Sequence, residues 1–332
     1  MTNSTTKAKN IIVVGASAGG IKAISSLLSS FTEDINASIF IVIHISANSM
    51  VEVILSHLQK HSKFPCRIAQ DGDQITNKTV FLAPADRHLC LTKDRIIVQK
   101  GPFENRYRPS IDVLFRTAAA AYDSCVIGVV LTGLLDDGTS GMSAIKQSGG
   151  ICIVQDPKEA EYTDMPRNVI NNIEVDYVVS VNEMGYIISD IITRKECDPS
   201  DVPEIVKKEA EISLRMNSSI ERTDELGSPS LISCPDCGGT LFKVRDPYVE
   251  RYRCYTGHSF TKKRLEDSIN KKLEESLWIA IRMMEERKNL LDNLMRDDAD
   301  NKDNGPLAKM KVERAEQLQI HIERLKTMLQ EF

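Results

Sequence analysis

The chain has 332 residues, which at about 150 residues per domain predicts roughly two domains. Its 42 Lys and Arg residues against 47 Asp and Glu residues leave a net charge of −5, so charge favours neither nucleic acid nor a membrane surface as a partner. The densest apolar stretch, from Ile39 to Ile45, is too short for membrane insertion. Because the polar N-terminus lacks the apolar core of a secretory signal, we expect a cytoplasmic location.

Short β-branched runs alternate with helix-like stretches over residues 11 to about 192. The runs IIVVGAS and SIFIVIHI each precede an amphipathic stretch, as strands of a parallel sheet do when helices connect them. This order predicts an α/β fold with a doubly wound, mostly parallel sheet in a three-layer αβα arrangement, spanning residues 11–194 after a disordered tail at 1–10. The segment HLCLTKDRIIVQ, with polar Lys93–Asp94 at its centre, predicts a hairpin near one sheet edge.

The alternation stops after Arg194, and a polar, serine-rich stretch follows at Asn217–Ser230. We therefore expect residues 195–232 to form a linker, followed by a small cysteine-rich segment at 233–262 and a helical tail at 263–332. In the tail, apolar residues recur at spacings of three and four on both sides of the polar break RDDADNKDNGP. This pattern predicts two helices, paired as a hairpin or through a dimer.

A glycine-rich turn, GASAGG at Gly15–Gly20, follows the first predicted strand at the sheet edge where α/β folds bind ligands. A dinucleotide-binding turn would need glycine where Ser17 stands. A nucleophile elbow, G-x-S-x-G, would instead use Gly15 and Gly19 to expose the Ser17 hydroxyl. The third interpretation is that the small residues only allow the helix to pack closely on the strand. The turn by itself does not choose among the three.

A nucleophilic serine needs a base, and of the six histidines only His44 ends an apolar strand. The first two strands of a doubly wound sheet are commonly neighbours, so Ser17 and His44 can meet at the same sheet edge. A carboxylate should orient the imidazole, and two acids, Asp136 and Asp137, follow the strand-like run at 125–132. Either acid could serve, and either could instead cap the helix that follows.

Five features follow one another over residues 11 to about 192: GASAGG, the histidine after the second strand, NRYRPSIDVLF, LTGLLDDGTSGM and DMPRNVI. Together and in this order they resemble the catalytic domain of the chemotaxis protein-glutamate methylesterases. The resemblance implies hydrolysis of glutamyl methyl esters on chemoreceptors with release of methanol, and deamidation of receptor glutamines as a related activity. It also implies a triad in which Ser17 is the nucleophile, His44 the base and Asp137 the acid.

The same resemblance suggests how substrate is bound. The backbone amides of Ala18 and Leu134 would form the oxyanion hole, because an N–H donor does not depend on its side chain. The family commonly has Met-Gly where Leu134 and Leu135 stand, and a bulky Leu135 would narrow the cleft or require a different turn. Arg106 and Arg108 are candidates for contact with the acidic surface of a receptor helix, although arginines near a turn are often only solvated.

A metal-ligand pattern lies late in the chain. Cys234 and Cys237 are followed by Cys254 and His258, and two ligand pairs across a short β-rich loop are typical of a zinc ribbon with a Cys₃His site. A redox C-x-x-C pair would not explain Cys254 and His258. Four protein ligands leave no open position for substrate, so we expect structural zinc and no cofactor for the hydrolysis itself.

The expected oxidation state of the remaining cysteines follows from the expected cytoplasmic location. Four that lie in or beside apolar runs are expected to be reduced and packed as small apolar side chains: Cys66, Cys90, Cys125 and Cys152. The receiver domain that usually precedes such an esterase is expected to be absent, because only ten polar residues come before the first strand.

Taken together, these features predict a cytoplasmic serine esterase whose ribbon and tail bind a signalling partner, such as a chemoreceptor, or a second copy. The alternative is a non-catalytic signalling scaffold that retains the fold.

Overall fold

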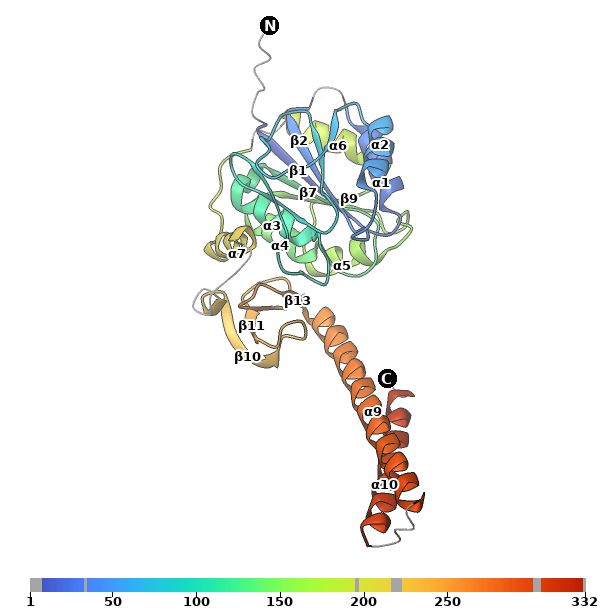
Figure 1. Cartoon of the computed structure of the whole chain (residues 1–332). Coiled ribbons are helices and arrows are strands. Elements are labelled where there is room, and N and C mark those ends of the chain that lie inside the picture. Colours follow the sequence, from blue (N-terminus) through green and yellow to red (C-terminus); the bar gives the residue numbers. More distant parts are fainter. Residues whose placement is uncertain (1–7, 33–34, 195–196, 216–222, 301–305, 331–332) are drawn as a thin grey trace. The chain divides into compact units, whose positions relative to one another are not determined.

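The computed structural model describes five stretches of the chain: residues 8–32, 35–194, 197–215, 223–300 and 306–330. The chain divides into two compact units, Met1–Lys262 and Lys263–Phe332. The first unit holds a large parallel sheet and a small antiparallel sheet, and the second holds two long helices (Figure 1). The predicted doubly wound α/β fold is confirmed in the first unit.

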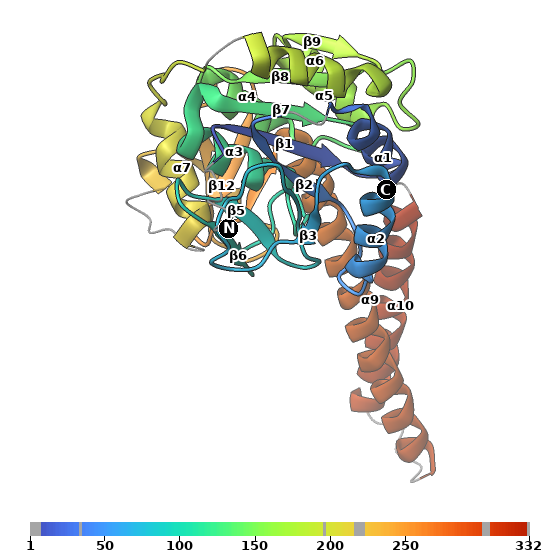
Figure 2. The same cartoon turned by 90° about the horizontal axis from the view of Figure 1, so that it is seen from above.

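Seven parallel strands form the large sheet, in the order β3-β4-β2-β1-β7-β8-β9. Their bounds are β1 Asn10–Ala16, β2 Ala37–Ile43, β3 Cys66–Ile68, β4 Val80–Leu82, β7 Val126–Val130, β8 Ile151–Gln155 and β9 Tyr177–Val179. Seen from above in Figure 2, β9, β8, β7, β1 and β2 follow one another across the sheet. The carboxyl ends of β1, β2 and β7 are therefore adjacent at the point where the strand order reverses, which is where such sheets bind ligands.

Helices cover both faces of the large sheet. One face carries α1 Gly20–Ser30, α2 Val51–His61 and α6 Val181–Arg194, and the other carries α3 Ile111–Tyr122, α4 Thr139–Gln147 and α5 Asp164–Asn172. Figure 1 shows α1 and α2 across the sheet from α3 and α4. Because side chains alternate along a strand, Ile11 and Val13 of β1 join the core under α3, while Ile12 and Val14 join the core under α1. Two covered faces explain the unbroken apolar runs of these strands.

The predicted hairpin is a separate two-stranded sheet. Its strands, β5 His88–Leu91 and β6 Ile96–Gln99, pair antiparallel. The hairpin lies against α3, where the Leu91 amide donates to Thr117 Oγ1 at 3.1 Å. A short 3-10 helix, η1 Asp123–Cys125, follows α3 and leads into β7.

Where the structure describes residues 195–232, expected to be a linker, it shows a helix and a strand. Helix α7 Glu204–Arg215 packs on α3, and β10 Gly227–Ser233 is the first strand of the small sheet. Val206, Ala210 and Ile212 of α7 are buried, so this charged segment has one narrow apolar face. The sequence did not predict α7, because three apolar residues among many charged ones give a weak signal, and β10 begins inside the polar stretch Asn217–Ser230.

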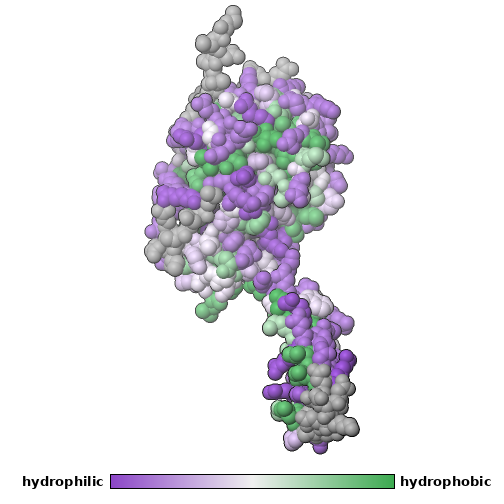
Figure 3. All heavy atoms as spheres, in the orientation of Figure 1, coloured by the Kyte–Doolittle hydropathy of each residue, from purple (hydrophilic) through white to green (hydrophobic). Residues whose placement is uncertain are grey.

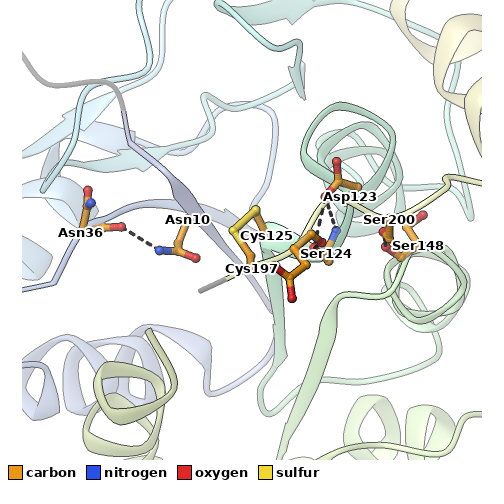
Figure 4. Close-up of a disulfide and its surroundings, with 9 residues drawn as sticks. Asn10, Asn36, Asp123, Ser124, Cys125, Ser148, Cys197 and Ser200 are labelled. Atoms are coloured by element: carbon orange, nitrogen blue, oxygen red, sulfur yellow. Dashed lines mark hydrogen bonds between the residues drawn. A yellow bond between two sulfur atoms is a disulfide. The ribbon is translucent and has the colours of Figure 1, made fainter. Parts of the chain in front are cut away.

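The expectation that Cys125 is a reduced, packed cysteine is wrong. A disulfide joins Cys125, just before β7, to Cys197 in the segment after α6 (Figure 4). The two residues are 72 positions apart, and Cys197 lies in polar sequence without a motif, so no local pattern in the sequence predicts that they pair. Close by, Ser200 Oγ donates to Ser148 O at 2.5 Å. The other three cysteines of that group are free thiols: Cys66, Cys90 and Cys152.

The small sheet belongs to the same unit as the large one. Its four antiparallel strands lie in the order β10-β11-β12-β13, with β11 Thr240–Val244, β12 Arg251–Cys254 and β13 Ser259–Thr261. The edge strand β13 is only three residues long. We call residues 227–262 the ribbon.

The second unit is a helical hairpin of α9 Lys262–Asp300 and α10 Pro306–Gln330. Lys326 of α10 donates to Glu285 of α9 at 2.7 Å, and Ile322 is buried. Other apolar side chains of the hairpin face outward, as the green surface in Figure 3 shows, and Trp278 is 52% exposed. Among the described residues, no helix combines the length and the apolar character needed to cross a bilayer.

Candidate active site

Ser17 follows β1 directly and lies in the turn that leads into α1. Its amide donates to Thr132 O at 3.1 Å, which joins this turn to the loop after β7. Gly19 has a φ of 74°, a left-handed conformation that glycine adopts without steric cost. A side chain at Gly133 would lie 2.8 Å from Ser17 Cβ. Glycine at position 133 therefore lets the loop after β7 pass close to the serine.

His44 follows β2, and its amide donates to Ala16 O at 3.1 Å, one residue before Ser17. Its Nε2 atom lies 2.8 Å from Asp137 Oδ2. The imidazole stacks on the Tyr107 ring, with centroids 3.6 Å apart and planes 5° apart. Nδ1 is buried and has no hydrogen-bond partner within the part of the chain that the structure describes. With the Nε2 proton directed at Asp137, Nδ1 carries the lone pair that can accept a proton.

Asp137 is fully buried and accepts hydrogen bonds from several elements. Besides His44, the donors are Ile111 N at 2.7 Å, Ser110 Oγ at 3.0 Å and Asn105 Nδ2 at 3.3 Å. The Ile111 amide is the first of α3, so the positive end of that helix faces the carboxylate. Burial raises the pKa of Asp137, but His44 and the donors at Ile111 and Ser110 outweigh burial and hold that pKa below its ordinary value. Asp137 is therefore a carboxylate at neutral pH.

The two other acids nearby have different contacts. Asp136 accepts a hydrogen bond from Thr261 Oγ1 of the ribbon, so of the two acids that the sequence left open only Asp137 contacts His44. Asp112 accepts from Gly138 N at 2.9 Å, and burial together with the charge of Asp137 raises the pKa of Asp112. The negative charge of the pair therefore resides on Asp137.

Ser17 and His44 line the same cavity, which has a volume of about 890 Å³. It extends along α1 toward His57 of α2 and Tyr186 of α6. Apolar surface gathers over α1 and α2 in the view of Figure 3, and Ile21, which lines the cavity, is 38% exposed. Since Nδ1 has no partner, Ser17 is not hydrogen-bonded to it, and in serine hydrolases this bond commonly tightens only around substrate.

The comparisons with known proteins agree on one family. The CheB methylesterase family model matches residues 12–188. A protein-glutamate methylesterase/protein-glutamine glutaminase of Methanosarcina mazei is 33% identical over 195 residues, covering 56% of this chain and 53% of that protein. A Leptospira interrogans protein that bears this name in provisional form is 40% identical over 175 residues, covering 52% of this chain and 90% of that protein. The chain belongs to the CheB methylesterase family.

A solved structure supports the same assignment for the large sheet. The crystal structure of the Thermotoga maritima CheB methylesterase catalytic domain matches with a TM-score of 0.53 and 28% identity, covering 55% of this chain and 98% of that one. The resemblance seen in the sequence is thereby confirmed. The family match ends at residue 188, before α7, the ribbon and the helical hairpin. This chain spans about half the length of the M. mazei relative.

The loop after β7 of this CheB-family chain has an unusual turn at Leu135. Leu135 has a φ of 77°, the left-handed conformation that the family's glycine would adopt without cost. Its amide donates to Asp164 Oδ2 at 3.3 Å and its carbonyl accepts from Asn168 Nδ2 at 2.6 Å, so α5 holds the turn. The leucine therefore keeps a glycine-type turn. The neighbouring Leu134 is 42% exposed at the surface of the same loop.

The two arginines singled out as substrate contacts differ. Arg106 is exposed, with a φ of 67°. The Arg108 guanidinium donates to Asp86 at 2.8 Å and to Gly101 O at 2.8 Å, and it lies 4.1 Å over the Phe103 ring. These contacts hold Arg108 against the loop that precedes α3, and Arg106 is the exposed one of the two.

Sequence reasoning missed two residues of this site, Asn105 and Tyr107. Both lie in NRYRPSIDVLF, a motif that carries the family resemblance but in which only Arg106 and Arg108 were predicted as site residues. Tyr107 covers the face of the His44 ring, and Asn105 donates to Asp137. A buried asparagine beside an aromatic residue has no sequence signature of its own, so only the folded loop relates them to the triad.

The four predicted metal ligands lie together in the ribbon. The ligand atoms of Cys234, Cys237, Cys254 and His258 are all within 4.8 Å of one another. Cys237 Sγ is 3.7 Å from Cys254 Sγ, close to the separation of about 3.8 Å that two zinc-bound sulfurs have in a tetrahedral site. His258 presents Nδ1, 3.5 Å from Cys254 Sγ. This cluster could hold a metal ion.

Proposed function

We propose that this CheB-family protein hydrolyses methyl esters of glutamyl side chains on chemoreceptors and releases methanol, with deamidation of receptor glutamines as a second reaction. The observation that carries the proposal is the orientation of His44. Nε2 is bonded to a buried carboxylate, and the unpartnered Nδ1 belongs to a residue that lines the same cavity as Ser17. That arrangement provides a general base beside a serine on a glycine turn.

In the first half of the reaction, Ser17 Oγ attacks the ester carbonyl carbon while its proton passes to His44 Nδ1. The negative oxygen that forms is stabilised by the Ala18 and Leu134 amides. The carbonyl re-forms as the C–O bond to the methoxy group breaks, and His44 returns the proton to give methanol. In the second half, water attacks the acyl-serine with the same base, which restores Ser17 and leaves a glutamate carboxylate. With a glutamine substrate, ammonia leaves in place of methanol.

Asp137 stabilises the imidazolium in both halves without taking its proton, because its pKa lies well below that of an imidazole. The test is methanol release from methylated receptor membranes by the full-length protein. Ser17→Ala should abolish release, and Ser56→Ala, an exposed serine of α2 outside the cavity, should not change it. A Ser17→Ala protein that still releases methanol would assign the nucleophile elsewhere, and a wild-type protein that binds receptors without releasing methanol would favour the scaffold alternative.

We also propose that the ligand cluster binds one Zn²⁺ as a structural ion through Cys234, Cys237, Cys254 and His258. Backbone turns support this set, since the Gly238 amide donates to Cys234 O at 2.8 Å and the Gly257 amide to Cys254 O at 3.0 Å. Metal analysis of the reduced full-length protein should find about one zinc per chain. A metal-free protein with a folded ribbon would contradict this assignment.

The exposed apolar residues of the helical hairpin support a third proposal, which is self-association through these helices. Five of them are more than half exposed: Trp278, Ile279, Met283, Leu290 and Leu307. Apolar residues in this number on two adjacent helices are typical of a surface that binds other helices.

A further inference from the structure

The edge of the ribbon contacts the loop that carries Asn105. The Asn105 amide donates to Ser259 O at 2.8 Å, and the Thr261 amide donates back to Asn105 Oδ1 at 3.1 Å. Glu104 forms an isolated parallel bridge with Ser259. The loop before α3 therefore pairs with β13 as a strand would, and Ser259 is the residue next to the ligand His258.

The same asparagine contacts the triad. Asn105 Nδ2 donates to Asp112 at 2.9 Å and to Asp137 at 3.3 Å. Its φ of 50° is one that asparagine tolerates better than most residues, and its side chain is buried. Two residues later, the same loop presents Tyr107 to the His44 ring. One side chain therefore bonds the ribbon with its oxygen and the catalytic carboxylate with its nitrogen.

A buried cluster of charges fixes the ribbon in this position. Arg253 of β12 donates to Glu104 in the loop, and Arg251 of the same strand donates to Glu209 of α7. Arg116 of α3 donates to Glu104 at 3.0 Å and lies 3.9 Å from Glu209. All five side chains are at most 5% exposed. The three arginines depend on the negative charges of the two glutamates, because a buried charge without a charged partner is strongly destabilising.

We propose that the ribbon, folded around its metal, is a positioning element for the esterase triad, and that Asn105 transmits the position of β13 to Asp137. The proposal rests on the esterase function proposed above. It replaces the expectation that a linker separates the metal site from the chemistry. Loss of the metal would release β13, free the Asn105 side chain and the Tyr107 loop, and so misplace the Asp137–His44 pair while the large sheet stays folded.

The test uses the full-length protein, with its metal removed genetically by Cys237→Ser, and a small glutamate γ-methyl ester as substrate. Cys237→Ser should lower kcat by about tenfold or more, because the Asp137–His44 pair is misaligned. KM should change by less than about twofold, because the residues that line the cavity stay in place. Asn105→Gly should do the same with the metal still bound, since glycine retains the left-handed backbone and removes only the side chain. Lys78→Gly is the matched control, because it replaces another left-handed residue (φ 54°) beside β4 and should leave kcat unchanged.

The combined variant Cys237→Ser with Asn105→Gly tests whether the effect of metal loss reaches Asp137 through Asn105. If Asn105 carries the effect, the two losses should not multiply, and the double variant should resemble either single one. The proposal is overturned if either single variant keeps kcat within about twofold of wild type, or if the two losses multiply.

Amide hydrogen exchange separates failure of this inference from failure of the proposed esterase function. Metal removal should speed exchange in a peptide covering residues 104–112 and leave β1 and β7 protected. If the wild type is active and the exchange rate of residues 104–112 is the same with and without metal, only the inference is refuted. An inactive wild type with metal-dependent exchange would refute the esterase function and leave the structural coupling in place.

Discussion

At the scale of single residues, the site depends on the number of hydrogen bonds that the Asp137 carboxylate accepts. Asp137 accepts from His44, from a helix amide, from a hydroxyl and from Asn105, and its pKa is lowered as a result. A carboxylate held in this way keeps the imidazole in the tautomer whose Nδ1 can take a proton. Asp136, adjacent in sequence, faces Thr261 instead.

This difference predicts the ranking of two conservative variants. Asp137→Asn should lower kcat by about 10⁴-fold, because an amide partner favours the wrong imidazole tautomer. Asp136→Asn should lose less than about tenfold, because an asparagine Oδ1 can still accept the Thr261 hydroxyl. Steady-state hydrolysis of a small methyl ester measures both variants. The opposite ranking would make Asp136 the triad acid.

At the scale of elements, α7 and β12 are joined through Glu209, whose carboxylate is bound by Arg251. Burial by itself raises the pKa of Glu209, but the neighbouring arginines Arg251 and Arg116 lower it far below the ordinary value. Burial also raises the pKa of Glu104, but Arg116 and Arg253 lower it, and the net effect is a pKa below the ordinary value. The contact between the ribbon and the helices therefore depends on ionised glutamates.

The lowered pKa sets the direction of a pH effect. Glu209 binds a proton more readily in the unfolded chain than in the folded one. Its carboxylate therefore stabilises the folded state fully above pH of about 4.3, its pKa in the unfolded chain, and this stabilisation is lost as pH falls through its lower pKa in the folded chain. Glu209→Gln should therefore cost about 3 kcal/mol of unfolding free energy at pH 7, and progressively less below pH of about 4.

Urea unfolding at pH 7 and at acid pH measures this dependence. Glu204→Gln is the matched control on the same helix, because Glu204 is 74% exposed in a surface pair with Lys207 and should cost well under 1 kcal/mol at either pH. Equal losses for Glu209→Gln at both pH values would show that its charge is not what holds the ribbon.

At the scale of the whole molecule, two units have separate cores. The first contains the candidate triad and the Cys₃His cluster, and the second is the helical hairpin with its outward apolar side chains. The proposed chemistry and the proposed metal site therefore lie in one unit, and the proposed self-association surface lies in the other. The chain has a single tryptophan, Trp278, and it lies on that hairpin.

Trp278 provides a direct readout of self-association. On dilution of the full-length protein, its emission should shift to longer wavelength as the apolar surface becomes exposed to water, and sedimentation should show a smaller species. Removing residues 273–332 should abolish association and leave kcat for a small ester within about twofold of wild type. Emission and sedimentation that stay constant over a hundredfold dilution would contradict self-association through the hairpin.

Local patterns in the sequence predicted most strands of the large sheet and the Cys/His cluster that could hold a metal ion. Parallel strands covered on both faces must be apolar throughout, and zinc ligands need fixed spacings. Both can therefore be recognised from short stretches of sequence. Ser17 and His44 were predicted as a pair for a similar reason, since each follows an apolar strand at one sheet edge. The motifs of the family then selected Asp137 from two adjacent acids.

Only the tertiary structure decided what joins these parts. Thr261 lies 156 residues from Asn105, and Cys197 lies 72 residues from Cys125, so neither pair leaves a local pattern. The apolar face of α7 is too narrow to be recognised among its charges, yet it places Glu209 beside the arginines of the ribbon. A hydrogen bond or buried ion pair depends on where the chain returns, and that is set by the packing of the whole unit rather than by any one segment.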